Sequence, residues 1–360
     1  MRRNAALIVG GGPAGTAAAI ALAHTGTRAL MLERTRETGD ALCGGFLSWR
    51  TLETLGSLGV EAGALNRDRV TRVRLFAGGR TAEAPLPRPA VCVSRRRLDT
   101  LLLDRVDAVE RGVGARAVEV DGIRLNDGTT VAADALFLAT GKHDLRGLAR
   151  PESARGSDPT LGLRVRLAPA PGLDALVADT IELHLFDRGY VGIARQEDGS
   201  VNLCMAVHRS RLSEAGSPAA LLAILGNEHP RLGERLAYMA SGAAIDAVAN
   251  VPYGWRQRSG TAGLFRLGDQ AGVIPSLAGE GMGIAIASGI AAARALSNGG
   301  PDAARTWQPA FARAVHRPIG VAGIVRAIGE GPLAPLLVAA ARPALIQIVA
   351  RLTRIGHRGH

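Results

Sequence analysis

The sequence contains few of the residues that build disulfide or metal sites. Its 360 residues include three cysteines, Cys43, Cys92 and Cys204, and no two of them form a Cys-x-x-Cys pair. An odd number of scattered cysteines indicates neither a disulfide framework nor a zinc site, so we expect no metal. The reducing cytoplasm is the expected location.

Lysine and aromatic residues are also scarce. Lys142 is the only lysine, so the formal net charge of +11 comes almost entirely from arginines spread along the chain. Aromatic residues make up 3% of the sequence, too few for a platform that stacks nucleic-acid bases. We therefore expect no nucleic-acid partner, and the sequence indicates no obligate protein partner.

Long apolar runs are missing as well. No uninterrupted apolar stretch reaches the roughly 18 residues of a membrane-spanning helix. Arg2 and Arg3 precede an apolar segment, as in a secretory signal, but glycines interrupt that segment after five residues. A chain of this length can form two domains, or one large domain with insertions.

A nucleotide-binding pattern occupies the first 33 residues. An apolar segment leads into a G-x-G-x-x-G turn, and an Ala-rich segment that favours a helix follows. Gly10 permits the tight turn, Gly12 allows close approach of a pyrophosphate, and Gly15 allows the helix to pack on the strand. The helix N-terminus is expected to bind the pyrophosphate. The expected contacts in this turn are Gly10, Gly12, Pro13, Ala14 and Gly15.

A second apolar segment ends on Glu33, which lies 18 residues beyond Gly15. An acidic side chain at that place accepts a hydrogen bond from a ribose hydroxyl, and its charge repels a 2′-phosphate. Arg34, the next residue, is assigned to the same site. The complete pattern predicts an ADP-containing dinucleotide and by itself leaves FAD and NAD open.

A second signature lies in residues 264–297. A short strand is expected to end at Gly268 and Asp269, a Pro/Gly-rich loop follows, and a helix of small residues starts near Gly281. This segment resembles the Gly-Asp motif of FAD-dependent oxidoreductases with the p-hydroxybenzoate hydroxylase fold, a group that includes the geranylgeranyl reductases. The resemblance favours FAD over NAD.

The resemblance also implies roles for this segment. Asp269 would bind the ribityl chain, Pro275 would lie beside the isoalloxazine, and the helix N-terminus would face the flavin N1–C2=O edge. A helix N-terminus stabilises the negative charge that reduced flavin carries there. The residues assigned to this half of the cofactor are Gly268, Asp269, Pro275, Gly279, Gly281, Met282 and Gly283.

Two segments are similar to other parts of that family. Residues 133–141 resemble the strand that returns to the nucleotide domain, with Thr140 and Gly141 where aromatic hydroxylases have Asp-Gly. Residues 93–99 resemble a segment whose arginine lies near FAD, which implies Arg95. A solvated arginine cluster at a helix start is the alternative for Arg95.

Cys43 and Gly44 open a third segment, similar to one in geranylgeranyl reductases where the cysteine faces the flavin. We expect Cys43 to lie near the cofactor without acting as a nucleophile. The alternative is a buried cysteine that acts as a small apolar side chain.

Residues 161–253 favour an antiparallel sheet and resemble the sheet that, in this family, covers the flavin and forms the substrate cavity. Strand-like stretches at 180–186 and 189–195 flank an Asp-Arg-Gly turn, and an Asp-Gly dipeptide marks a second hairpin. Tyr190 falls where geranylgeranyl reductases carry Tyr-x-Trp-x-Phe-Pro, of which only the tyrosine is present. Tyr190 is a candidate donor to substrate, or a tyrosine packed in the sheet. With Cys43 and Pro275 it makes up the expected catalytic set.

Residues 309–360 are apolar, basic and helical in pattern. The segment is expected to form a helical cap over the FAD and substrate domains. The alternative is an interfacial element with peripheral membrane contact that admits a greasy substrate. A cap can also line the mouth of a cavity.

The predicted fold is α/β, with a Rossmann-type FAD-binding domain, an inserted antiparallel-sheet substrate domain and a C-terminal helical segment. The discontinuous FAD-binding domain is expected to comprise residues 1–70, 91–150 and 256–298. The substrate domain would comprise residues 71–90 and 151–255, and the cap residues 299–360.

The resemblance implies an FAD-dependent monooxygenase that acts on a hydrophobic, aromatic or polyketide-derived small molecule through a flavin C4a-hydroperoxide. NAD(P)H would be a transient electron donor, because the sequence shows no second G-x-G-x-x-G. The alternative is a geranylgeranyl reductase-like enzyme that reduces prenyl or other alkene double bonds. A halogenase, or a flavoprotein without catalytic activity, would be a more distant possibility.

Overall fold

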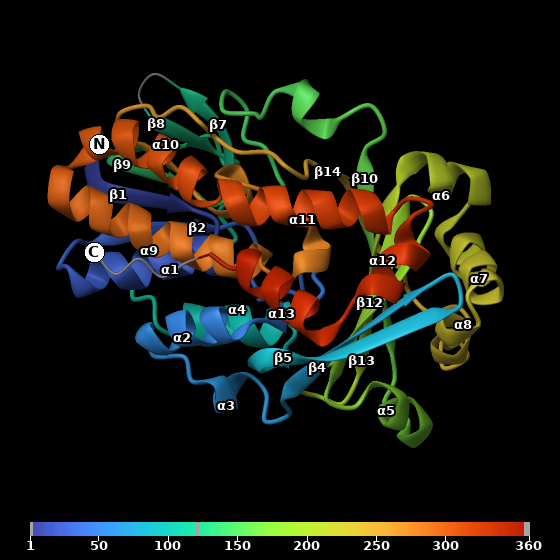
Figure 1. Cartoon of the computed structure of the whole chain (residues 1–360). Helices are drawn as coiled ribbons and strands as arrows, with labels where there is room; N and C mark the ends of the chain where they lie inside the picture. The colour runs from blue at the N-terminus through green and yellow to red at the C-terminus, as the bar shows by residue number, and fades with distance from the viewer. Residues whose placement is uncertain (1–2, 120–121, 356–360) are drawn as a thin grey trace.

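The computed structural model describes residues 3–119 and 122–355. It contains one sheet of seven strands and one of eight. Figure 1 shows the two sheets next to each other, with the C-terminal helices crossing the region between them. This arrangement confirms the predicted α/β fold with an inserted sheet and a C-terminal helical segment.

The first sheet is built around parallel strands. Leu7 in the central strand pairs with Leu30 on one side and Leu136 on the other. A strand with parallel neighbours on both sides is buried on both faces, so it reads as a continuous apolar run. In order across the sheet the strands are β6 (Val109–Arg111), β2 (Ala29–Glu33), β1 (Arg3–Val9), β9 (Thr130–Leu138), β8 (Gly122–Leu125) and β7 (Ala115–Glu119), and β15 (Leu264–Arg266) pairs in parallel with β9.

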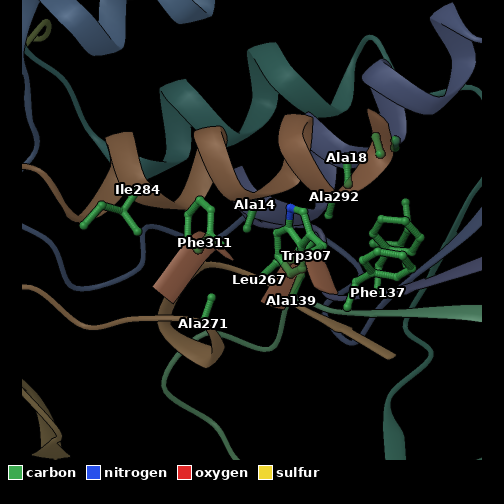
Figure 2. Packing of buried hydrophobic residues seen from close by; sticks show 14 of the residues in the cluster. Ala14, Ala18, Phe137, Ala139, Leu267, Ala271, Ile284, Ala292, Trp307 and Phe311 are labelled. Atoms are coloured by element: carbon green, nitrogen blue, oxygen red, sulfur yellow. The ribbon is translucent and has the colours of Figure 1, made fainter. Parts of the chain in front are cut away.

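Two helices of small residues pack closely beside this sheet. They are α1 (Pro13–His24) and α9 (Gly281–Gly299), and Figure 2 shows Ala14, Ala18 and Ala292 at their contact. A β-carbon at Gly289 would lie 2.3 Å from the carbonyl oxygen of Ala14 and 2.8 Å from the backbone nitrogen of Ala18. The helix that follows the first glycine motif is therefore packed against the helix that follows the second.

The second sheet is antiparallel except for β11 and β4, which pair in parallel. The predicted strands 180–186 and 189–195 have the observed bounds of β11 and β12, and Arg188 between them has a positive φ of 59°. In order, the strands are β14 (Asp246–Val251), β10 (Thr160–Leu167), β13 (Val201–His208), β12 (Gly189–Arg195), β11 (Thr180–Phe186), β4 (Val70–Ala77), β5 (Arg80–Cys92) and β3 (Phe46–Leu47).

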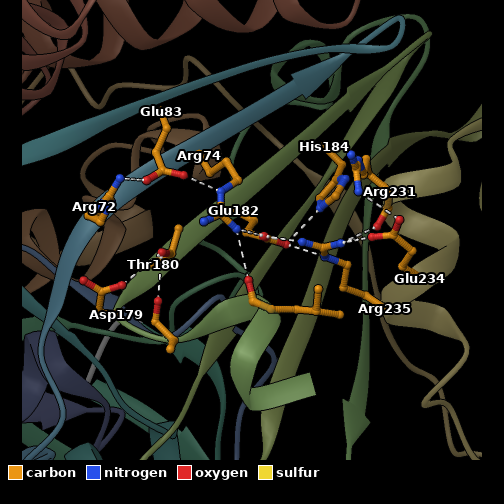
Figure 3. A network of polar contacts seen from close by, with 12 residues as sticks. Arg72, Arg74, Glu83, Asp179, Thr180, Glu182, His184, Arg231, Glu234 and Arg235 are labelled. Atoms are coloured by element: carbon orange, nitrogen blue, oxygen red, sulfur yellow. Dashed lines mark hydrogen bonds and ion pairs between the residues drawn. The ribbon is translucent and has the colours of Figure 1, made fainter. Parts of the chain in front are cut away.

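One face of the second sheet carries a buried ion network (Figure 3). The carboxylate of Glu182 in β11 is fully buried and accepts hydrogen bonds from Arg235 (2.8 and 2.9 Å), Arg74 (2.8 Å) and His184 (3.2 Å). Arg235 belongs to α8, so the network ties this helix to the sheet. The helices that follow strands of this sheet are α5 (Pro171–Val177), α6 (Arg209–Ala215), α7 (Pro218–Glu228) and α8 (Pro230–Leu236).

The remaining helices lie on the nucleotide side or in the C-terminal segment. In Figure 1, α11 extends along the molecule toward the second sheet, while α12 and α13 lie against β5. The division into domains predicted from the sequence stays a prediction. These helices are α2 (Trp49–Ser57), α3 (Ala62–Leu65), α4 (Arg95–Leu103), α10 (Ala304–Ala314), α11 (His316–Gly329), α12 (Ala334–Ala340) and α13 (Pro343–Leu352).

Candidate functional site: an FAD cleft with an adjoining cavity

The first glycine motif forms the predicted turn between β1 and α1. Gly10 has a φ of 109°, and a β-carbon there would lie 2.4 Å from the carbonyl oxygen of Ala139. A β-carbon at Gly15 would lie 2.0 Å from the carbonyl oxygen of Gly10. Gly12 is the N-cap of α1, and Pro13 opens the helix. Only glycine fits at Gly10 and Gly15, and the helix N-terminus is left without an acidic cap.

Glu33 and Arg34 follow β2 at the same edge of the sheet. One carboxylate oxygen of Glu33 accepts from the backbone nitrogen of Gly11 at 2.8 Å, and the other accepts from the backbone and hydroxyl of Thr35. The side chain of Arg34 lies 3.0 Å from Nε2 of His143. Glu33 is thus held beside the glycine turn, while Arg34 points toward the loop after β9.

The two glycine motifs, which are far apart in the sequence, lie side by side. The backbone nitrogen of Leu267 donates to the carbonyl of Leu138 at 2.9 Å, which extends the pairing of β15 with β9. A β-carbon at Gly268 would lie 3.2 Å from the β-carbon of Ala14. The strand ends therefore bring the Gly-Asp motif to the start of α1.

The loop after β9 is hydrogen-bonded to the Gly-Asp motif. The side-chain amide of Gln270 donates to the carbonyl of Gly141 at 2.9 Å. The guanidinium of Arg150 donates to the carbonyls of Asp269 at 3.0 Å and Lys142 at 2.7 Å. Thr140 donates its hydroxyl to the carbonyl of His143. Thr140 and Gly141 are thereby fixed next to Asp269.

Lys142 is a site residue that sequence reasoning missed. Its ammonium lies 3.4 Å from the carboxylate of Asp269, and this carboxylate raises the pKa of Lys142. The signal in the sequence was compositional, because one lysine in an arginine-rich chain falls in the predicted FAD site. The pair places one positive and one negative charge at the end of β15.

Arg95 faces the same region from the start of α4. Its guanidinium forms two hydrogen bonds with Asp99, at 2.7 and 3.0 Å, and it lies 3.4 Å from where a β-carbon of Gly12 would be. Burial opposes the charge of Arg95, but Asp99 raises its pKa, with smaller contributions from Cys43 and Asp269. Arg95 therefore reaches the first glycine turn from α4.

The loop before α9 presents the start of that helix. Gly279 has a φ of 62°, and its missing β-carbon would lie 2.7 Å from the ring of Phe46. A β-carbon at Gly281 would meet no atom within 4 Å in the described chain. Met282 instead packs into an apolar cluster, and a β-carbon at Gly283 would meet Glu280 and Thr51. Among these residues, Gly281 is the open position.

Two tyrosines meet the loop next to Pro275. The hydroxyls of Tyr190 and Tyr253 both hydrogen-bond with the hydroxyl of Ser276. Burial raises the pKa of Tyr190 well above its ordinary value and also raises that of Tyr253. The structure thus joins two residues of the expected catalytic set, Tyr190 and Pro275, through Ser276, and it adds Tyr253, which the sequence did not single out.

Cys43 is half-buried beside β13. Its carbonyl accepts from the side-chain amide of Asn202 at 2.9 Å, and its sulfur accepts from the backbone nitrogen of Gly45 at 3.5 Å. A β-carbon at Gly44 would meet no atom within 4 Å among the described residues. Burial raises the pKa of Cys204 to about 12, with the nearby Cys43 adding to the effect. The segment around Cys43 is therefore fixed by hydrogen bonds, and the space next to the α-carbon of Gly44 is free.

These residues fit an FAD molecule. Glu33 would hold the adenosine ribose, the α1 N-terminus would bind the pyrophosphate, and Asp269 would hold the ribityl chain. A β-carbon at Gly44, Gly141 or Gly281 would meet no described atom within 4 Å, so a ligand can approach the backbone at these three glycines. Bound FAD would supply hydride-transfer chemistry, while the chain would bind and orient it. The role of each residue stays a prediction.

A cavity of about 410 Å³ adjoins the Pro275 loop. Its apolar wall comes largely from α11, and its polar end contains a carboxylate, an imidazole and two guanidinium groups. Glu330 there accepts from Arg326 at 2.8 Å and contacts Nε2 of His208 at 3.0 Å. The lining residues are Arg188, His208, Tyr253, Gly254, Pro275, Ile319, Gly323, Arg326, Ala327 and Glu330.

Comparisons with known proteins agree with this geometry. Residues 3–147 match the FAD binding domain family. Over 346 residues the chain is 29% identical to a menaquinone reductase of Mycobacterium tuberculosis, which covers 88% of this chain and 81% of that protein.

Two solved structures show the same fold. A geranylgeranyl bacteriochlorophyll reductase-like protein from Thermoplasma acidophilum has a TM-score of 0.70 at 20% identity, covering 99% of this chain and 94% of that one. PqsL, a probable FAD-dependent monooxygenase from Pseudomonas aeruginosa, has a TM-score of 0.71 at 18% identity, covering 94% and 100%.

The fold and the N-terminal domain define an FAD-dependent oxidoreductase. The chain shares its fold with solved structures of PqsL and of a geranylgeranyl bacteriochlorophyll reductase-like protein. The family resemblance stated from the sequence is confirmed, and so is the choice of FAD.

Proposed function

We propose that this oxidoreductase reduces a carbon–carbon double bond in a hydrophobic, prenyl-type substrate that binds in the cavity beside Pro275. The observation that carries the proposal is the group of three hydroxyls from Tyr190, Ser276 and Tyr253, of which Tyr253 lines this cavity together with Pro275. Reduction of an alkene needs a hydride and a proton. Reduced FAD would supply the hydride, and a tyrosine hydroxyl would supply the proton.

The raised pKa values of the two tyrosines support this assignment. A tyrosine hydroxyl is already protonated at neutral pH, and burial raises the pKa of Tyr190 and Tyr253 further, so both hydroxyls remain available as donors. The activation of a phenol for hydroxylation would instead call for a base. The likeness to menaquinone reductases over 88% of the chain also favours reduction of an isoprenoid compound.

The second candidate is a monooxygenase, which the fold shared with PqsL favours. Under that alternative the same cavity holds an aromatic or polyketide-derived substrate, and oxygen is a co-substrate. Both reactions begin with reduction of FAD, so the two are separated by the product and not by cofactor binding.

We infer that the electron donor is NAD(P)H, bound transiently. A polar cavity of about 210 Å³ next to the loop after β9 supports this inference. Lys142, Arg150 and Arg155 contribute to its lining and offer positive charge to phosphate groups. The direct check is stopped-flow reduction of bound FAD by NADPH and by NADH under nitrogen.

The deciding experiment uses reduced, FAD-loaded enzyme with menaquinone carrying an unsaturated side chain. Under nitrogen we expect a side chain heavier by two hydrogen atoms, identified by mass spectrometry after any quinol in the stopped reaction has been reoxidised to quinone. If substrate is converted only when oxygen is admitted, and the product gains an oxygen atom, the enzyme is a monooxygenase and the proposal is wrong.

The variant Tyr253→Phe tests the proton donor. We expect it to keep FAD and to slow substrate reduction by about a hundredfold, since loss of a positioned acid has effects of that order. Tyr238→Phe is the matched control, because Tyr238 lies on the surface outside the cavity lining. Equal rates in both variants would show that Tyr253 does not deliver the proton.

A further inference from the structure

The C-terminal helices expose most of the large apolar side chains on the described surface. Six such residues stand out in residues 3–119 and 122–355, and five of them lie on or directly before α11, α12 and α13. Each of these five exposes between 45% and 65% of its surface. They are Ile324, Leu333, Leu336, Leu345 and Ile348. Since α11 contacts both α12 and α13, the five belong to one region of the molecule.

The charges in this region have one sign. From residue 309 to residue 355 the only acidic residue is Glu330, which is buried and ion-paired. Four arginines of the segment are exposed, and within the described chain none of them has a carboxylate partner. They are Arg313, Arg317, Arg342 and Arg351. Exposed leucine and isoleucine side chains accompanied by unpaired arginines match the surface of an anionic bilayer.

The cavity beside Pro275 borders the same region. Ala327 lies in its lining and is exposed, and Gly323 is half-buried next to the exposed Ile324. A compound dissolved in a bilayer under α11 would therefore be next to the cavity lining without passing through water. In the described residues no single helix is long and apolar enough to cross a membrane, while the bent pair Pro301–Gly329 and Ala334–Ala340 passes that test by length and composition.

We propose that the face formed by α11, α12 and α13 docks on the surface of a membrane rich in anionic lipid. The apolar side chains enter the boundary between headgroups and acyl chains, and the exposed arginines on or directly before these helices, Arg317, Arg342 and Arg351, contact lipid phosphates. This inference goes beyond the proposed function and does not depend on which reaction FAD supports. If both are correct, substrate enters the cavity directly from the bilayer.

The test is co-sedimentation of the full-length, FAD-loaded protein with vesicles. We expect binding to an equal mixture of phosphatidylglycerol and phosphatidylcholine, weaker binding to phosphatidylcholine alone, and a loss of binding at high salt. The double variant Leu336→Ser/Leu345→Ser should bind anionic vesicles at least about tenfold more weakly, because two apolar anchors are removed. Tyr238→Ser, which changes the exposed apolar residue outside the face, should bind like the parent protein.

The arginines are tested separately. Arg342→Gln/Arg351→Gln should lose most of the preference for anionic vesicles, whereas Arg116→Gln, on β7, should keep it. Flavin absorbance and circular dichroism verify that each variant is folded and loaded. Folded parent protein that stays in the supernatant with anionic vesicles would overturn the proposal. The proposal would also be overturned if the parent protein were a dimer and the leucine variants were monomers that bind vesicles as the parent does. That result would mean that a second copy of the chain covers the face.

Catalysis gives an independent readout. If the protein binds vesicles but does not reduce the alkene, the docking proposal stands and the proposed reaction is wrong. If it reduces the alkene but does not bind vesicles, the proposed reaction stands and the docking proposal is wrong.

Discussion

The ammonium group of Lys142 lies 3.4 Å from the carboxylate of Asp269. The two residues come from different strand ends, since Lys142 follows β9 and Asp269 follows β15. Parallel pairing of these strands places both ends at one edge of the sheet. That edge is where ligands bind in open α/β folds.

Removal of the Asp269 carboxylate should weaken FAD binding. We expect Asp269→Ala to raise the FAD dissociation constant by about tenfold to a hundredfold, because a hydrogen bond to a charged acceptor is lost. Quenching of flavin fluorescence on titration measures this constant. Asp302→Ala is the control, since Asp302 is exposed in a surface turn and should leave the constant unchanged. Unaltered affinity in Asp269→Ala would contradict the role assigned to Asp269.

Removal of the Lys142 charge should have a smaller effect on the same constant. We expect Lys142→Met to weaken FAD binding by about fivefold at most, because the pair with Asp269 is partly exposed to solvent. Lys142→Arg keeps the charge and should recover most of the loss. If the methionine and arginine variants bind FAD equally poorly, the shape of the lysine matters and its charge does not.

The contact between α1 and α9 should not accept a methyl group. A β-carbon at Gly289 would meet the backbone of Ala14 and Ala18, so Gly289→Ala should lower the free energy of unfolding by about 1–3 kcal/mol or more. Gly320→Ala is the matched control in α11, where a β-carbon would meet no described atom within 4 Å. There the free energy of unfolding should rise by up to ~1 kcal/mol. Urea unfolding of both variants gives the comparison.

The buried network around Glu182 should make stability depend on pH. Burial acts to raise the pKa of Glu182, but hydrogen bonds from His184 and Arg235 outweigh it and hold the pKa at about 2. A carboxyl group whose pKa is lower in the folded than in the unfolded protein stabilises the folded state at pH values above its unfolded pKa. This contribution, about 3 kcal/mol, is lost as the pH falls from roughly 5 toward 2.

Glu182→Gln tests that dependence. The variant should be less stable at neutral pH, and its free energy of unfolding should change less between neutral pH and acid than that of the parent. Asp302→Asn should show the parent's slope. An identical acid slope in Glu182→Gln would mean that Glu182 is not the group that titrates.

Part of the second sheet was readable from local sequence. The strands at 180–186 and 189–195 were predicted with their observed bounds, because a turn containing Arg188 and Gly189 separates two apolar runs. Strand β14 was not predicted. Its six residues, Asp246–Val251, lie at the sheet edge with mostly exposed or half-buried side chains and show little apolar periodicity.

The sequence by itself determined the FAD-binding turn, because Gly10 adopts a positive φ of 109° and a β-carbon at Gly15 would strike the carbonyl of Gly10, five residues earlier. Such constraints act over a few residues and leave a visible spacing. Only the tertiary structure decided that Lys142 pairs with Asp269 and that Tyr190 meets Ser276. It also gathered the exposed apolar residues of α11–α13 on one region beside the cavity. These contacts join residues on separate elements, so they exist only once the sheets and helices have packed.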